Sequence, residues 1–415
     1  MKIKFNYRMG LFLAFMSLVF SDSMFLKDRN LDGIVFYASL MLLCLLIGFC
    51  FIKSRRSAAK WNTVLFGLVT SIFLLIGIAV QHLPLLIKGR LIFSMVVIVL
   101  LVTAGKDLLK NLDDVRLVSY SILAGCGLSI LVALITKSPM AESRVEAFGG
   151  KVISTGPLGF TGGLQYKNFF AADLLASFIG LVIYQKYRHR KSNRVDIFWI
   201  AVIVVLEILA YSKTCILLIP IFCVLLFGLP SLKSKGKYGV LGVGFFSLAG
   251  VVFIFSLYLI VRSDNYGYRV RGLTNYLSYF SHDSFRLWFG NAEMAFGNPE
   301  LGYVKTVRSV VGWNGTMELA LLDVLIKNGI LGIIGYCLIL LHWIIVLVRE
   351  TFPMRLPMLS VLCIFILSAC VESYVVNMHV AFGVFCYLLL AAFSKGKEFD
   401  VRSSTDLPYV PKDTI

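Results

Sequence analysis

The sequence is poor in charge for its length. Only 15% of its 415 residues are Asp, Glu, Lys or Arg, whereas 58% are hydrophobic, and the mean hydropathy is +0.84. A water-soluble domain with this balance would leave large apolar patches in water. The composition therefore excludes an ordinary soluble protein.

Motifs for nucleotide and metal chemistry are also missing. The chain has no P-loop, no GxGxxG after an expected strand, no HExxH and no periodic repeat. Its nine cysteines follow no CxxC spacing and fall within apolar runs or at their edges, which predicts neither a disulfide nor a metal site. We expect no cofactor and no metal, so the energy for any reaction must come with the substrate.

Acidic residues are scarce, with 23 Asp and Glu against 40 Lys and Arg, but the net charge of +17 does not indicate a nucleic-acid partner. The basic residues lie in the gaps between apolar runs instead of forming a stripe on a soluble domain. Placing both termini in the cytoplasm puts most of them on the cytoplasmic side, as the positive-inside rule requires. We therefore expect a multi-pass protein with both termini cytoplasmic.

Long apolar runs dominate the sequence. Runs of roughly 17 to 25 residues, enough to span a hydrocarbon core of about 30 Å, recur along the chain. They predict an all-α integral membrane protein of about twelve transmembrane helices, forming a single polytopic domain over residues 1–415. The expected spans are 9–26, 33–52, 62–85, 91–105, 117–136, 168–184, 196–211, 214–229, 238–261, 329–348, 357–375 and 379–393.

The first apolar run has two interpretations. Basic residues precede it, as in a cleaved signal peptide, and residues 20–23 form a conceivable cleavage zone. That zone lacks an Ala-x-Ala pattern, and apolar residues resume at Met24. We favour a retained first helix, with cleavage as the alternative.

Two loops are longer than tight turns, and both are expected on the outer face by the parity of the spans. They cover residues 137–167 and 262–318, the second between helices 9 and 10. Long loops in compact proteins are usually functional or disordered. The second loop is too rich in Tyr, Phe and Trp for a disordered tether, so we expect it to fold over the outer mouth of the bundle.

Ionisable residues near the outer ends of the spans predict an outward-facing polar chamber, because buried charge in a membrane usually marks a site. They are Asp173, Glu207, Lys213, Asp323, Lys327 and Glu372. Lys213 stands in a very short turn between two apolar helices, where its ammonium can bind a diphosphate or simply extend to the lipid surface.

The large outer loop adds basic and acidic candidates. Arg269, Arg271 and Arg286 suit an anionic leaving group, although surface ion pairs of a solvated loop explain them equally well. Glu318 and Asp323 lie at the amino-terminal end of an expected helix, which favours negative charge and can hold a general base.

Four segments carry a resemblance to a known family. They are Arg144 with the glycine-rich segment 159–172, the Ser212-Lys213-Thr214 turn, the basic segment 269–277 before Phe289-Gly290, and the segment 317–332. In this order they resemble the O-antigen and capsular polysaccharide polymerase family (Wzy-like), which shares its architecture with the O-antigen ligases. Ligases and many polymerases have a His-Asn pair where this chain has Glu318-Leu319, and the acidic version is closer to capsule polymerases of Gram-positive bacteria.

The resemblance implies roles for individual residues. Glu318 and Asp323 are the expected catalytic residues, Glu318 as the base that activates the acceptor hydroxyl and Asp323 as its positioning partner. His282 ranks below Glu318 as a base. The expected substrate-binding residues are Lys213, Arg271, Arg269, Arg286, Arg144 and Asn168. Among them Lys213 and Arg271 are expected to stabilise the leaving diphosphate, with Arg286 in reserve.

The implied function is polymerisation of lipid-linked oligosaccharide repeat units at the outer face of a bacterial plasma membrane. The growing glycan would pass from undecaprenyl diphosphate to an acceptor hydroxyl by metal-independent, inverting transfer. The expected partners are undecaprenyl-diphosphate-linked oligosaccharide, membrane lipids, and the flippase and chain-length regulator of the same pathway. Two alternatives remain: a ligase that moves finished polymer to another acceptor, and a lipid-linked sugar flippase or transporter.

Overall fold

The computed structural model describes residues 7–53, 59–142, 145–148, 151–154, 159–188, 193–228, 264–295, 319–349, 353–395 and 399. Within these ranges the chain is predominantly helical, and five helices are long and apolar enough to cross a membrane by length and composition. They are Asp32–Lys53, Leu85–Thr103, Leu112–Thr136, Lys167–Tyr187 and Ala320–Arg349. The expectation of a helical protein with membrane-spanning segments is confirmed at this level.

The first part of the chain is helical up to residue 136. Its elements are α1 (Tyr7–Ser21), α2 (Met24–Lys27), α3 (Asp32–Lys53), α4 (Ala59–Val80), α5 (Leu85–Thr103), the 3-10 turn η1 (Gly105–Asp107) and α6 (Leu112–Thr136). The first helix ends at Ser21, earlier than expected, because Ser23 begins a separate short helix. The Ser23 hydroxyl accepts a hydrogen bond from the N–H of Leu26 and caps α2.

The second part holds the remaining helices. They are α7 (Lys167–Tyr187), α8 (Arg194–Ala210), α9 (Lys213–Cys223) with the π-helical turn η2 (Val224–Gly228), α12 (Asp264–Tyr279), α13 (Ser284–Phe289), α14 (Ala292–Ala295), α16 (Ala320–Arg349), α17 (Arg355–Ala369) and α18 (Ala381–Phe393). Every expected span except 238–261 overlaps one of the described helices, and 238–261 lies outside the described residues.

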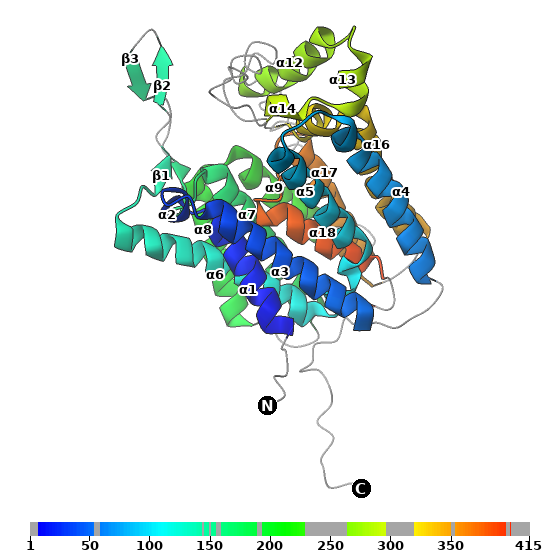
Figure 1. Cartoon of the computed structure of the whole chain (residues 1–415). Helices are drawn as coiled ribbons and strands as arrows, with labels where there is room; N and C mark the ends of the chain where they lie inside the picture. The colour runs from blue at the N-terminus through cyan, green and yellow to red at the C-terminus, as the bar shows by residue number, and fades with distance from the viewer. Residues whose placement is uncertain are drawn as a thin grey trace, which may run out of the picture.

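The segment expected as the first outer loop contains short strands. β1 (Ala141–Glu142) pairs with β4 (Gly159–Phe160), and β2 (Val145–Phe148) pairs with β3 (Lys151–Ser154), both antiparallel. In Figure 1 the β2–β3 hairpin extends away from the helices. Hydropathy alone did not predict these strands because they lie between apolar runs.

Two helices form the centre of the bundle. Every residue of α18 is buried, as is α7 from Phe170 to Tyr184. Burial along their whole described face means that other helices, and not lipid, surround both of them. α18 contacts α5, α7 and α17, while α7 contacts α6, α8 and α9 (Figure 1).

Outer helices expose apolar stripes, as expected of surfaces that face lipid. On α3 the exposed large side chains recur at helical spacing, with Ile34 66% exposed, Met41 51%, Leu45 65%, Phe49 49% and Ile52 76%. The opposite face of α3 is buried against α1. In water such a stripe would be unfavourable, whereas in a bilayer it meets hydrocarbon.

The bundle has two distinct ends. Arg8, at the start of α1, pairs with Asp114, and Lys395, just after α18, pairs with Asp107 at distances of 2.9 and 3.8 Å, so both helices reach the segment around η1. We call this the terminal end. At the opposite end lie the strands and α12 to α14 (Figure 1), and we call it the loop end.

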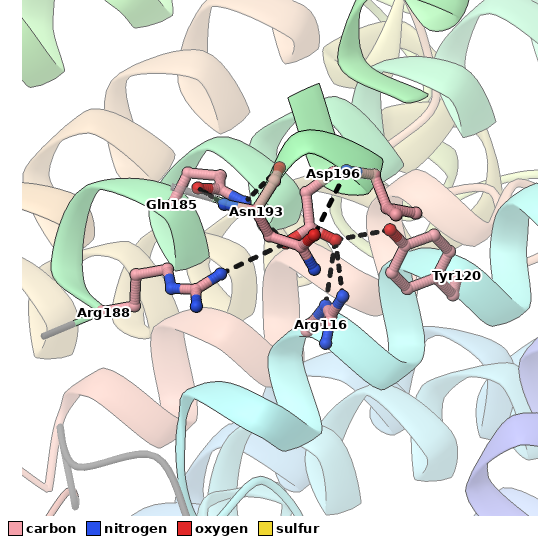
Figure 2. A network of polar contacts seen from close by, with 7 residues as sticks. Arg116, Tyr120, Gln185, Arg188, Asn193 and Asp196 are labelled. Atoms are coloured by element: carbon pink, nitrogen blue, oxygen red, sulfur yellow. Dashed lines mark hydrogen bonds and ion pairs between the residues drawn. The ribbon is translucent and has the colours of Figure 1, made fainter. Parts of the chain in front are cut away.

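A buried polar network joins α6, α7 and α8 at the terminal end. Asp196 accepts hydrogen bonds from Arg116 Nη2 at 2.7 Å, Tyr120 at 2.5 Å and Gln185 Nε2 at 2.5 Å, while Arg188 lies 3.9 Å away (Figure 2). Two guanidinium groups therefore compensate one buried carboxylate. Because removing one partner of such a pair is costly, this network fixes the three helices relative to one another.

Candidate functional site

The Ser212-Lys213-Thr214 turn lies at the loop end between α8 and α9. Tyr211 adopts a left-handed conformation (φ 54°), and its N–H donates to Glu207 O and Ile208 O, both at 3.2 Å, which closes α8. α9 then begins at Lys213, whose side chain is exposed. The sequence therefore places this ammonium at the end of two apolar helices with very little intervening chain.

A buried carboxylate joins this turn to the large outer loop. Glu372 is only 5% exposed, and its Oε1 accepts hydrogen bonds from Thr214 Oγ1 and from Arg269 Nη2, both at 3.3 Å. Arg269 Nη1 also donates to the Val371 carbonyl at 2.9 Å. Lys213, the residue before Thr214, is thus brought to the same part of the loop end as Arg269.

Arg269 and Arg271 occupy different sides of α12. Two positions along a helix turn a side chain to the far side, so only one of the two arginines faces the bundle. Arg271 is exposed, and its Nε donates to Gly267 O in its own helix at 3.4 Å. Arg269, and not Arg271, is the arginine that contacts Glu372.

Lys167 adds another cation near the turn. Its Nζ lies 5.7 Å from the centre of the Tyr211 ring. A Cβ atom at Gly159 would lie 2.5 Å from the Ala210 carbonyl oxygen, so the glycine-rich segment packs closely on the end of α8. Asn168 follows Lys167 in the first turn of α7 and is half-buried. Sequence reasoning did not select Lys167, although it stands next to Asn168 in the glycine-rich motif.

Asp323 is held by a neighbouring lysine. Its Oδ2 lies 2.7 Å from Lys327 Nζ one helical turn later, and the carboxylate is largely buried. α12 packs over this part of α16 through Tyr276, Leu322 and Ile326. The packing links Asp323 to the helix that carries Arg269.

Other expected site residues lie apart from this cluster or outside the description. Arg286 forms an exposed pair with Asp283 at 3.4 Å, and its guanidinium lies 5.4 Å from the centre of the Phe280 ring. His282 is exposed. Glu318 and Arg144 lie outside the described residues. Within the described ranges no group of three or more His, Cys, Asp or Glu side chains is arranged to hold a metal ion.

The arrangement is suited to binding an anion at a membrane surface. Lys213 is exposed and Lys167 lies nearby beside Tyr211, while Arg269 is already fixed by a carboxylate. Cations held in place beforehand stabilise negative charge without reorganising when it develops. The chain matches no family model and no curated protein.

Proposed function

We propose that this protein polymerises lipid-linked oligosaccharide repeat units of the capsular polysaccharide or O-antigen type. One observation carries the proposal: Thr214 and Arg269 share Glu372 Oε1, each at 3.3 Å, so the Ser-Lys-Thr turn meets the basic helix of the large loop. These are two of the segments that resemble the Wzy-like polymerases.

The proposed reaction is an inverting glycosyl transfer. The acceptor hydroxyl attacks the anomeric carbon of the growing glycan, the bond from that carbon to the diphosphate oxygen breaks, and Glu318 takes the hydroxyl proton. Lys213 and Arg269 stabilise the charge that develops on undecaprenyl diphosphate. Electrostatic help of this kind is typically worth about 3 kcal/mol for each donor.

The remaining candidates have supporting roles. Asp323 positions the base, and Asn168 and Arg144 contact the donor from the glycine-rich side. Arg271 and Arg286 contact the glycan from the exposed side of the loop, in keeping with the exposure of both side chains. None of these steps needs a nucleotide or a metal.

The proposal includes a topology. The chain would cross a bacterial plasma membrane about twelve times with both termini in the cytoplasm, so that the loop end is external. It would then receive undecaprenyl-linked units from a flippase and act with a chain-length regulator.

Single substitutions in the producing cell test the proposal. Lys213→Ala and Arg269→Ala should each make single lipid-linked repeats accumulate while long polymer disappears from gels. Arg29→Ala is the matched control, because Arg29 is an exposed basic residue of the loop end that stacks on Phe25 at 3.8 Å. Normal polymer from both site variants would end the proposal.

The same gels separate a ligase, because its loss would leave long lipid-linked chains. Loss of a flippase would also leave single units, but these would stay on the cytoplasmic face, where a probe added outside the cell does not label them. A flippase should also carry charge at mid-membrane depth. Asp173 lies only about 9 Å along α7 from its first residue, at 1.5 Å per residue, and Glu207 lies within the last turn of α8, which favours the polymerase.

A further inference from the structure

Two buried carboxyl groups, each with one oxygen that lacks a hydrogen-bond partner, lie where α1, α6 and α7 meet at the loop end. Asp22 is 4% exposed and Asp173 is 1% exposed. Asp22 Oδ2 and Asp173 Oδ1 have no hydrogen-bond partner, and neither carboxylate has an ion pair within the described part of the chain. Burying an unpaired carboxylate is costly, and either a bound proton or a nearby cation relieves that cost.

Irregular backbone surrounds these groups. Asp22 follows the last residue of α1, and its carbonyl accepts from the N–H of Gln165 at 2.9 Å. The N–H of Met24 donates to the Gly163 carbonyl, also at 2.9 Å. Gly162 and Gly163 both have positive φ, of 58° and 81°. The break after α1 and the glycine-rich turn are therefore joined side by side, as in ion sites built from interrupted helices.

A third oxygen without a partner faces this turn. Ser129 of α6 is 1% exposed, and its Oγ has no hydrogen-bond partner in the described residues. A Cβ atom at Gly163 would lie 3.1 Å from Ser129 Oγ and 2.8 Å from the Ser129 carbonyl oxygen. This hydroxyl is an observation independent of the two acids, and it adds a neutral oxygen ligand to the same place.

The charges around the two acids indicate which kind of ligand would complete this location. Asp173 lies within electrostatic range of Asp22 and faces the backbone N–H groups of Ala381 and Phe382 at the start of α18. That helix end contributes roughly half a positive charge. Lys27, which is exposed, interacts with Asp22 from the surface. The helix end and Lys27 together supply roughly one and a half positive charges against the two carboxylates, and Asp32, which also acts on Asp22, adds negative charge, so the location keeps a negative excess.

We propose that Asp22, Ser129 and Asp173 bind an alkali cation, which connects α1, α6 and α7 at the glycine-rich turn. A charge of one balances the carboxylates, and hard oxygen ligands suit an alkali ion better than a transition metal. The site shares no residue with the cluster of Lys213, Arg269 and Glu372. Its test needs no substrate, so it stands or falls independently of the proposed function.

Thermal unfolding of the full-length protein in nanodiscs tests this site. Sodium chloride should raise the melting temperature saturably above that in choline chloride of equal ionic strength and pH, because a ligand that binds only the folded state stabilises it. Asp173→Asn should abolish the response, and Ser129→Ala should raise the sodium concentration at half-effect by about tenfold. The control is Glu207→Gln, which alters another buried carboxyl without a partner and should keep the response.

Equal melting temperatures of the wild type in sodium, lithium, potassium and choline chloride would overturn the proposal. The proposal would also be overturned if the double variant Asp22→Asn/Asp173→Asn still melted at a higher temperature in alkali salt. The same holds if low pH raised the melting temperature of the wild type and no alkali ion changed this effect. If the variants do not fold, binding of radioactive sodium to the wild type is measured instead. Saturable binding that choline does not displace supports the site. The absence of such binding overturns it.

Discussion

At the scale of single residues, Glu372 is the group on which the loop end depends. It is the shared acceptor of Thr214 and Arg269, and the pair with Arg269 leaves only 13% of the arginine side chain and 7% of the glutamate side chain exposed. A pair with so little exposure is costly to break from one side, because the remaining charge stays buried. Glu372 therefore helps to hold the Arg269 side chain in its position at the loop end.

Substituting Glu372 separates its charge from its hydrogen bonds. Glu372→Ala should lower the free energy of unfolding by about 3 kcal/mol, because Arg269 would lose a carboxylate partner at a position where only 13% of its side chain is exposed. Glu372→Gln keeps an oxygen that accepts both hydrogen bonds, so its loss should be smaller and part of the polymer should remain. Chemical denaturation measures the loss of stability in both variants. Gels of the cell extracts measure how much polymer remains.

Arg271→Ala is the stability control, because Arg271 is exposed on the same helix, and its effect should stay within about 0.5 kcal/mol. An alanine variant of Glu372 as stable as this control would show that the pair with Arg269 contributes nothing.

Asp22 gives a pH dependence. It lies in the turn beyond the end of α1, where burial raises its pKa from 3.8 to about 7, with Lys27 opposing the shift. A raised pKa in the folded state means that the stability gained by holding the proton is lost as pH rises through about 7. In choline buffer the protein should melt at a higher temperature at about pH 5 than at about pH 8, and Asp22→Asn should flatten this difference. Equal pH profiles for the two proteins would contradict this account.

At the scale of elements, Gln81 connects the large loop to the bundle. Its Nε2 donates to Phe289 O at 2.6 Å and to Lys327 O at 3.0 Å, and its Oε1 accepts from the N–H of Ala292 at 2.7 Å. One side chain at the end of α4 thus satisfies backbone groups of the α13–α14 segment and of α16. The large loop is therefore fixed on α16 close to Asp323.

Gln81→Leu should remove one hydrogen bond from each of these three backbone groups. A lost hydrogen bond to a buried group costs about 1 to 3 kcal/mol, so a loss of about 3 kcal/mol is expected. Limited proteolysis should then cut the α13–α14 segment much faster than in the wild type. Ser94→Ala, whose hydroxyl bonds only its own helix, should be cut at the wild-type rate. Equal rates for both variants would refute the role of Gln81.

Hydropathy predicted most helices, because an apolar run long enough to cross a bilayer has few other stable structures. It did not predict α12 to α14, which lie in the large loop and carry no long apolar run. Its apolar span begins only at 329, whereas α16 begins at Ala320, close to the helix start expected from Glu318 and Asp323. Gly329 breaks the helical geometry there with φ 70° and ψ −167°. This conformation accompanies close packing against Trp288 and Gly290, which a local sequence pattern does not reveal.

The candidate site was predicted only in part for a similar reason. Lys213 was recognisable from its position between two apolar runs. The choice between Arg269 and Arg271 required the rotation of α12 about its axis, which the sequence does not specify. Glu372 stood out as a buried charge, but its contact with Arg269 joins residues 103 positions apart, and no spacing rule reaches that far.

At the scale of the whole molecule, the two ends of the bundle are built differently. At the terminal end, Asp114 and Asp196 are each paired with arginine, which suits a structural junction. At the loop end, Lys213 is exposed, Arg269 is paired with Glu372, and Asp22 and Asp173 each bury an oxygen that has no hydrogen-bond partner. We infer that the chemistry takes place at the loop end, and that the terminal end holds the helices in place.

Elongation by the purified protein tests this central claim most directly. Wild-type protein in nanodiscs, given lipid-linked repeat units in sodium buffer without nucleotide or divalent metal, should convert single units into a ladder of longer chains. Lys213→Ala and Arg269→Ala should leave single units. A wild type that lengthens no chain, or variants that lengthen chains as fast as the wild type, would contradict the account.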